Sequence, residues 1–276
     1  MTLPIKLGTL RVLMKEISIS AQADKPLVVG GPPALAQTLR RELGIGGGDE
    51  PRGAAVYVHI WGGSHDEAAL TRARRARVPI VALAPPDVDD VPYVLATDVV
   101  RLQPGHGFPL EALAAAIAGR LGEEAAPLAA RVPLLRRAVA EQLIASFARR
   151  NALIAAAVFI PGVDLPVLVR NELRLVLRLH QAYGHDVDPR ARLPEIGVTF
   201  AAGVGLRAVA RELLDLVPPD DDEGVGGLLA GRRRLGRRRF QRVAGWAVKG
   251  AVAYSGTRAL GEATLRRLEI GAPRGH

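Results

Sequence analysis

The chain has 276 residues, no cysteine, 49% hydrophobic residues and a formal net charge of +9. The apolar fraction is ample for a folded core, and the length allows two domains of ordinary size. The lack of cysteine excludes disulfide scaffolds, iron–sulfur clusters, thiolate metal sites and cysteine nucleophiles. Residues 1–125 hold 13 Lys/Arg and 14 Asp/Glu, whereas residues 126–276 hold 24 and 14, so the net charges are −1 and +10. The second half is therefore the one expected to meet nucleic acid, anionic lipid or an acidic partner.

The N-terminal segment, residues 1–23, alternates apolar and charged side chains and lacks the apolar core of a secretory signal. We expect an amphipathic arm that packs on the protein, with a helix lying on a membrane surface as the alternative. The best candidate for a transmembrane helix, Ala152–Val169, contains Asp164 and two prolines. Buried helices are therefore the leading interpretation of the apolar windows, and membrane-inserted hairpins remain open.

Residues 24–122 alternate short apolar runs with helical patterns, which predicts an α/β domain. The expected strands are Lys25–Gly30, Ala54–Trp61, Val78–Leu83 and Val99–Leu102. The first expected helix starts at Pro32 and Pro33 and runs through Leu43, and the next two are Asp66–Arg77 and Pro109–Leu121. Short links between such elements predict parallel pairing of the strands, with helices on both faces of a small sheet.

The first strand–helix turn begins with Gly30 and Gly31, and in such folds a phosphate binds there. A phosphate-binding loop reads G-x-x-x-x-G-K-[ST], because backbone N–H groups cradle phosphate, lysine neutralises charge and the hydroxyl holds Mg²⁺. In this register Leu35, Ala36 and Gln37 replace the second glycine, the lysine and the hydroxyl residue. Two prolines in the turn also remove N–H donors. We therefore expect no nucleotide hydrolysis, and at most weak nucleotide binding at the start of the following helix.

The same segment resembles the Era-like small GTPases in register but not in chemistry. Val81–Asp87 stands where that family has its guanine-reading N-K-x-D motif, but Ala84 and Pro85 replace the Asn and Lys. Only Gly44–Gly53 separates the first helix from the second strand, which leaves no room for switch loops. The resemblance implies a P-loop-like fold without hydrolysis, a pseudo-GTPase. The vestige of its nucleotide site would be Gly30, Gly31 and Asp87.

Histidines in this half do not form a pattern typical of catalysis. His59 lies in an expected strand and is interpreted as a satisfied core residue. His65 and Asp66 stand at a helix start, where capping and interaction with the helix dipole are expected. No His/Asp/Glu cluster has the spacing of metal ligands, so neither a metal nor another cofactor is expected.

Residues 126–276 read as a basic helical domain rich in Gly and Ala. A long amphipathic helix is expected over Pro127–Asn151, and a second over Val167–Tyr183, closed by Gly184. A stripe of small residues at a spacing of four predicts a close helix pair. The stripe consists of Ala247, Ala251, Ser255, Ala259 and Ala263.

Two segments, Phe159–Gly184 and Val252–Glu262, resemble the uncharacterised YcjF-like domain that accompanies Era-like GTPases in bacteria. The Pro-Gly-x-Asp-Leu-Pro turn that begins at Pro161 and the Ser-Gly-Thr segment that begins at Ser255 carry this resemblance. It implies a membrane-associated helical domain at, or partly in, the inner face of the cell membrane. No reaction is attributed to that family, so the resemblance implies no catalytic residues in this chain.

A charged insertion, residues 218–242, changes from acidic to Gly-rich to strongly basic, with seven arginines within 232–242. A solvated loop that partly neutralises itself is one interpretation, and a loop bound to anionic lipid headgroups is another. Nucleic-acid binding is a third, although only Phe240 interleaves with the arginines as a stacking residue. The residues expected to bind an anionic surface are Arg232, Arg233, Arg234, Arg237, Arg238 and Arg239.

These features predict a non-catalytic interaction or scaffold protein in the cytoplasm, associated with the inner face of the cell membrane. An anionic membrane surface is the expected partner, and a protein partner or a second copy of the chain remains open. The alternatives are residual GTP or ATP binding and nucleic-acid binding through the arginine-rich segment.

Overall fold

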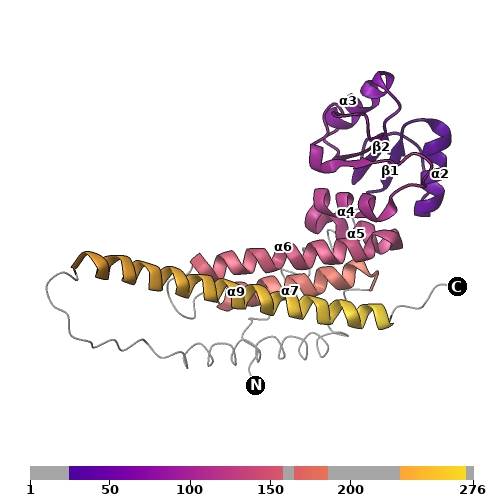
Figure 1. Ribbon diagram of the computed structural model, residues 1–276. Helices are drawn as coiled ribbons and strands as arrows, with labels where there is room; N and C mark the ends of the chain where they lie inside the picture. The colour runs from indigo at the N-terminus through magenta and orange to yellow at the C-terminus, as the bar shows by residue number, and fades with distance from the viewer. Residues whose placement is uncertain (1–24, 158–164, 186–230, 272–276) are drawn as a thin grey trace. The chain divides into compact units, whose positions relative to one another are not determined.

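The computed structural model describes residues 25–157, 165–185 and 231–271 (Figure 1). The expected N-terminal arm, the turn at Pro161 and the acidic start of the insertion lie outside the described residues. The chain has an α/β part followed by long helices, as expected. Within the described ranges, no helix combines the length and the apolar character that crossing a membrane requires.

Four short strands form one parallel sheet in the order β1-β2-β3-β4. They are β1 (Leu27–Gly30), β2 (Val56–Ile60), β3 (Ile80–Ala84) and β4 (Val99–Arg101). The first three are buried along their whole length, which is why their sequences are continuous apolar runs rather than alternating ones. The predicted parallel sheet is therefore confirmed.

Helices cover both faces of this sheet, as predicted. Helix α3 (Glu67–Arg75) packs Leu70 against alternate residues of the sheet, among them Tyr57 and Ala82. Helix α4 (Leu110–Leu121) lies on the opposite side of the strands from α3 (Figure 1).

Helix α2 has the predicted limits, Pro33–Leu43. Proline suits the first helical position because its missing N–H has no partner there, and Gly44 ends the helix in a left-handed conformation (φ 66°). Short 3₁₀ turns complete this part of the chain. They are η1 (Ser64–Asp66), η2 (Ala96–Asp98), η3 (Gly122–Glu124) and η4 (Pro133–Leu135).

The single helix expected over Pro127–Asn151 is wrong. Helix α5 (Ala125–Arg131) ends before Val132, and α6 (Arg136–Ala157) begins after η4. Pro133 is the cause, because a residue that precedes proline is pushed out of the helical region. Val132 accordingly has φ −114° and ψ 90°.

Two more helices follow, α7 (Leu165–Ala182) and α9 (Gly231–Gly271). Gly184 closes α7 as predicted: its N–H donates to Gln181 O, and the N–H of His185 donates to His180 O. The loop expected for the arginine-rich segment is wrong, because α9 begins at Gly231 and includes all of 232–242. The loop was predicted from the density of charge, but arginine has a high helix propensity, so a run of arginines also favours a helix.

The chain forms two compact units. Of the described residues, the sheet unit contains 25–143 and 177–185, and the helical unit contains 144–157, 165–176 and 231–271. Helices α6 and α7 each contribute one part to either unit.

Within the helical unit, α9 runs antiparallel to α6 and approaches it closely at two glycines. A Cβ atom on Gly250 would lie 3.2 Å from the carbonyl oxygen of Ala152, and one on Gly261 would lie 2.6 Å from Cγ1 of Ile144. The predicted small-residue stripe is wrong for four of its five members, because Ala251, Ser255, Ala259 and Ala263 are exposed; the side chain of Ala247 lies outside the described ones. A spacing of four drifts around a helix of 3.6 residues per turn, and the glycine-bearing face makes the contact instead.

Candidate functional site

The sheet places the predicted nucleotide residues along the edge formed by the carboxyl ends of its strands, where ligands bind in parallel α/β folds. Gly30 is the last residue of β1, and Gly31 follows it with φ 115°. Asp87 is exposed in the turn after β3. Strand β2 lies between β1 and β3, so this edge holds all three residues but sets Asp87 apart from the glycines.

Protein atoms fill the space beside the two glycines. A Cβ atom on Gly30 would lie 1.9 Å from the Tyr57 hydroxyl oxygen, and one on Gly31 would lie 2.3 Å from the carbonyl oxygen of Ile60. A Cβ atom on Gly62 would lie 2.9 Å from Cγ of Pro32. The turn after β1 therefore lies directly against the end of β2 and the loop that follows it. These glycines permit close contact between two parts of the chain.

The start of α2 lacks the side chains that a phosphate loop uses. Ala36, at the lysine position of the loop register, is buried with 2% exposure, whereas Leu35 is 45% exposed. Pro32 occupies the N-cap position without a side-chain hydrogen bond to the helix. A longer cationic side chain at position 36 would be directed into the core rather than toward a ligand.

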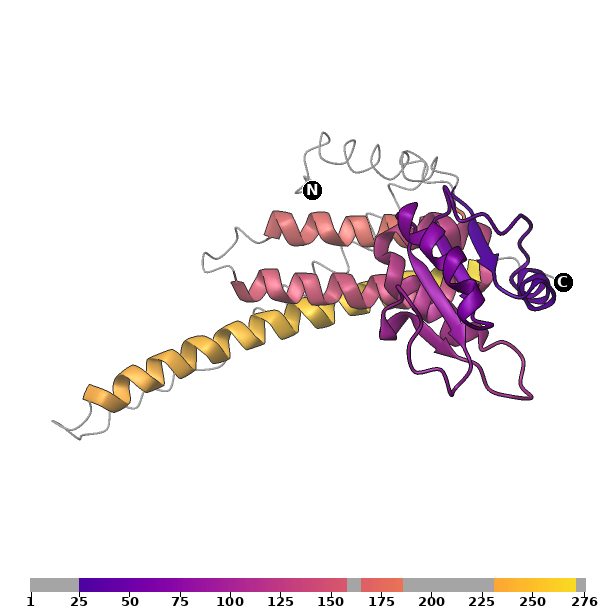
Figure 2. The same cartoon turned by 90° about the horizontal axis from the view of Figure 1, so that it is seen from above.

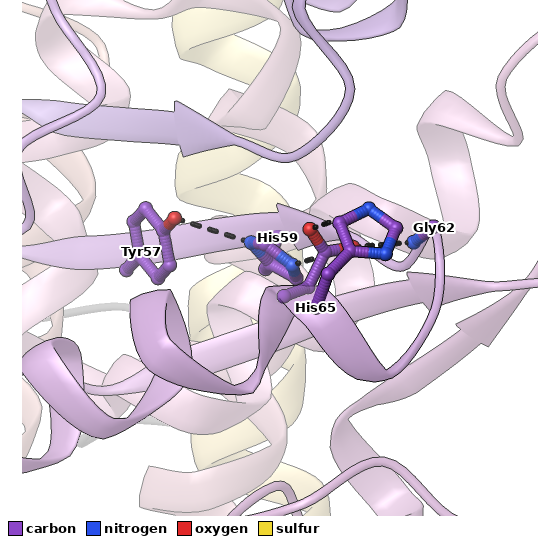
Figure 3. A network of polar contacts seen from close by, with 5 residues as sticks. Tyr57, His59, Gly62 and His65 are labelled. Atoms are coloured by element: carbon purple, nitrogen blue, oxygen red, sulfur yellow. Dashed lines mark hydrogen bonds and ion pairs between the residues drawn. The ribbon is translucent and has the colours of Figure 1, made fainter.

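Beside this turn, Tyr57, His59 and Asp66 form a chain of polar contacts, of which Figure 3 labels the tyrosine and the histidine. The Tyr57 hydroxyl lies 3.1 Å from Nδ1 of His59, and Nε2 of His59 lies 3.4 Å from Oδ2 of Asp66. The backbone N–H of Gly62 donates to the same carboxylate oxygen over 2.6 Å. His65, at the exposed end, places its Nε2 3.5 Å from the other oxygen, Oδ1.

Burial sets the protonation states in this cluster. Burial lowers the pKa of His59 below its ordinary value of 6.5, against the opposing effect of Asp66. Burial also raises the pKa of Tyr57 to about 12. At neutral pH the histidine is therefore neutral and the phenol protonated. Neutral His59 with its proton on Nε2 can direct that N–H toward Asp66 and accept the Tyr57 O–H at Nδ1.

This cluster resembles a proton relay in composition, but its geometry is that of a structural core. Tyr57 and His59 are each 1% exposed, and the hydroxyl at the inner end lies against Gly30. A catalytic acid or base must reach the proton that it transfers. Neither ring offers a substrate such access, so the cluster links β2 to the loop that follows it.

The structure confirms part of what the sequence predicted for His59 and contradicts the capping role predicted for Asp66. His59 as a core residue is confirmed by its burial, but as a satisfied one only in part: Nδ1 lies at hydrogen-bond distance from the Tyr57 hydroxyl, whereas buried Nε2 lies near Asp66 without a hydrogen bond to any described residue. Capping of α3 by Asp66 is wrong, because the carboxylate accepts from the preceding Gly62 and makes no cap hydrogen bond. The pairing of Tyr57 with His59 was missed, although residues two apart on a strand share a face.

The arginine-rich segment precedes Gly250, where α9 contacts α6. Gly250 contacts Ala152, only five residues before the end of α6, and the arginines lie still earlier in α9. At 1.5 Å per residue, Gly231 is about 28 Å from Gly250 along the helix axis. Figures 1 and 2 both show the start of α9 extending past the neighbouring ends of α6 and α7.

Comparisons with family models, curated proteins and solved structures find no match for this chain. Nor does the described part of the chain contain a group of three or more His, Asp or Glu side chains that could hold a metal ion. Function is therefore inferred from the chemistry of this chain's own residues.

Proposed function

We propose that this chain is a non-catalytic interaction protein that attaches to an anionic membrane surface through the first turns of α9. The observation that carries the proposal is the placement of all seven arginines of 232–242 in the part of α9 that precedes Gly250. The N-terminus of a helix is its positive end, so cations there raise the electrostatic energy of the isolated chain. A polyanionic surface relieves this repulsion and is attracted to each arginine.

Apolar residues of the same unit favour lipid over nucleic acid. Leu153, in the last turns of α6, is 71% exposed, and Val167, in the first turn of α7, is 47% exposed. A membrane interface accepts both basic and apolar side chains, whereas single-stranded nucleic acid is bound by cations with several stacking aromatics. The inner leaflet of the cell membrane supplies the anionic lipids, which supports a cytoplasmic location.

The non-catalytic part of the proposal is supported by the crowded carboxyl edge of the sheet. Tyr57 lies against Gly30, and the position of the phosphate-loop lysine holds buried Ala36. The exposed Asp87 is the remaining support for a pseudo-GTPase site that still reads a base. Incubation with Mg²⁺ and GTP or ATP should give no phosphate release above a protein-free blank. Phosphate release by the unchanged chain that the Asp87→Asn variant no longer shows would contradict the proposal that the chain is non-catalytic.

Vesicle flotation tests the membrane proposal. The full chain should float with phosphatidylcholine vesicles that contain phosphatidylglycerol, should stay behind with phosphatidylcholine alone, and should be released by high salt. Each arginine near an anionic surface contributes ~1 kcal/mol, so changing six to glutamine should weaken partitioning at low salt by up to about ten-thousandfold. The six are Arg232, Arg233, Arg234, Arg237, Arg238 and Arg239.

A matched control removes the same number of charges from exposed arginines elsewhere in the chain. These are Arg41, Arg52, Arg72, Arg75, Arg266 and Arg267. The control variant should float almost as well as the unchanged chain. Equal losses in the two variants would mean that net charge alone drives adsorption. Failure of the unchanged chain to float at low salt, or stronger binding to single-stranded DNA than to vesicles, would overturn the membrane proposal.

A further inference from the structure

An open cavity of about 540 Å³ lies at the amino end of β3, on the sheet edge opposite to Gly30. Its cationic wall consists of Arg74 and Arg77, at and after the end of α3, and Arg120, in the last turn of α4. Apolar surface comes from Ile80 and from the loop that contains Tyr93. The volume is in the range of small-molecule sites.

The three guanidinium groups of this cavity differ in how far the protein neutralises them. Nε of Arg120 lies 3.5 Å from Oδ2 of Asp98. The Arg74 guanidinium lies over the Tyr93 ring, 4.7 Å from its centroid, which attracts the cation without neutralising it. The Arg77 side chain makes no hydrogen bond or ion pair with any other described residue. The cavity therefore retains positive charge available to an anion.

Backbone conformation points to the same cavity. Arg77 (φ 56°) and Tyr93 (φ 67°) are the two non-glycine residues with positive φ in the described ranges, and both line it. Arg77 stands just past α3: its N–H donates to Arg74 O, and the N–H of Val78 donates to Ala73 O. Glycine is the usual residue at this position, because other residues are strained there. A strained backbone at a non-glycine residue marks a candidate functional position, so the Arg77 side chain is a candidate for a role in the cavity.

We propose that this cavity binds a phosphate monoester joined to a planar ring, of the size of a nucleoside monophosphate. Guanidinium groups match phosphate oxygens with paired hydrogen bonds, and Arg77 and Arg74 provide two that no carboxylate among the described residues neutralises. Tyr93 and Leu95 are 44% and 58% exposed, which leaves apolar surface for the ring of the ligand. The site uses neither the arginine-rich segment of α9 nor the carboxyl edge of the sheet.

Isothermal titration of the full chain with adenosine monophosphate tests the site. Adenosine and inorganic phosphate should each bind at least about tenfold more weakly than the monophosphate, because each supplies half of the contacts. Arg77→Gln should weaken binding about tenfold or more, as expected for a lost charge-assisted hydrogen bond. Arg75→Gln, at an exposed residue of α3 outside the cavity, should leave affinity unchanged.

A second variant, Arg77→Gly, separates binding from folding. Glycine suits the positive φ at this position, so the variant should have a higher unfolding midpoint while it binds adenosine monophosphate more weakly. The proposal is overturned if millimolar monophosphate gives no binding, or if Arg75→Gln and Arg77→Gln weaken it equally. Loss of binding in Asp87→Asn with unchanged binding in Arg77→Gln would instead place the ligand at the carboxyl edge.

Discussion

At the end of β1, the missing Cβ of Gly30 determines which group occupies the space beside the strand. The Tyr57 hydroxyl occupies the place that a side chain at position 30 would need, and it is hydrogen-bonded there to His59. The sequence suggested Gly30 as a vestige of a nucleotide site; in the structure, the missing Cβ of Gly30 makes room for the Tyr57 ring of the neighbouring strand.

Gly30→Ala should lower the free energy of unfolding by about 3 kcal/mol or more, because the added methyl group overlaps the hydroxyl of a buried ring. Chemical denaturation followed by circular dichroism measures this loss. Adding Tyr57→Phe should recover only part of it, since ring carbon Cζ would still lie 2.7 Å from the new Cβ atom. Gly46→Ala, at a site with no atom within 4 Å, is the control. A Gly30→Ala chain as stable as the control would contradict the crowded edge.

His59 makes the stability of the sheet unit depend on pH. Its pKa is lower in the folded chain than the ordinary 6.5, so below that pH the unfolded chain binds a proton that the folded chain does not. The free energy of unfolding should therefore fall as pH drops below 6.5, by up to about 1.4 kcal/mol per pH unit. His59→Gln should reduce this slope, whereas His106→Gln, at an exposed residue, should not. Equal slopes in all three chains would refute this role.

At the scale of elements, the helical unit combines glycine contacts with buried polar side chains. Nδ2 of Asn151 in α6 donates to the Thr257 hydroxyl of α9 over 2.9 Å, and Nδ2 of Asn171 in α7 donates to Oδ1 of Asn151 over 2.9 Å. Asn151 and Thr257 are fully buried. Such directional bonds fix the rotation of each helix in a way that apolar packing alone does not.

Gly261→Leu should destabilise the helical unit by about 1–3 kcal/mol, because its side chain must displace Ile144 from a close contact. Ala259→Leu adds a comparable side chain at an exposed position of the same helix and should change stability little. Thermal unfolding of the two variants provides the comparison. A larger loss for Ala259→Leu would restore the small-residue stripe as the contact face.

The sequence predicts elements better than contacts. The strands, α2 and the Gly184 end of α7 follow from apolar runs, proline and glycine, which act locally. The break at Pro133 was also local, but the apolar pattern continued across it and concealed it. The Tyr57–His59–Asp66 cluster and the exposed alanine stripe depend on which residues other elements bring near, and a single sequence does not contain that information.

On the scale of the whole molecule, the residue at which the net charge changes sign is not the residue at which one compact unit ends and the other begins. The sequence divides near residue 125, where net charge changes from −1 to +10. The sheet unit, however, also contains residues 126–143 and 177–185 from the basic half. There the Arg136 guanidinium lies 6.0 Å from the centroid of the Tyr183 ring, and Leu179 is fully buried. The boundary in charge therefore does not coincide with the boundary between the two units.

The passage of α6 and α7 through both units has a consequence for biosynthesis. Residues 177–185, which complete the sheet unit, leave the ribosome only after residues 144–157 and 165–176 of the helical unit. Domains made in one continuous stretch can fold in the order of their synthesis. Here the sheet unit receives residues 177–185 only after part of the helical unit has been translated, so the sheet unit is not complete before synthesis of the helical unit has begun.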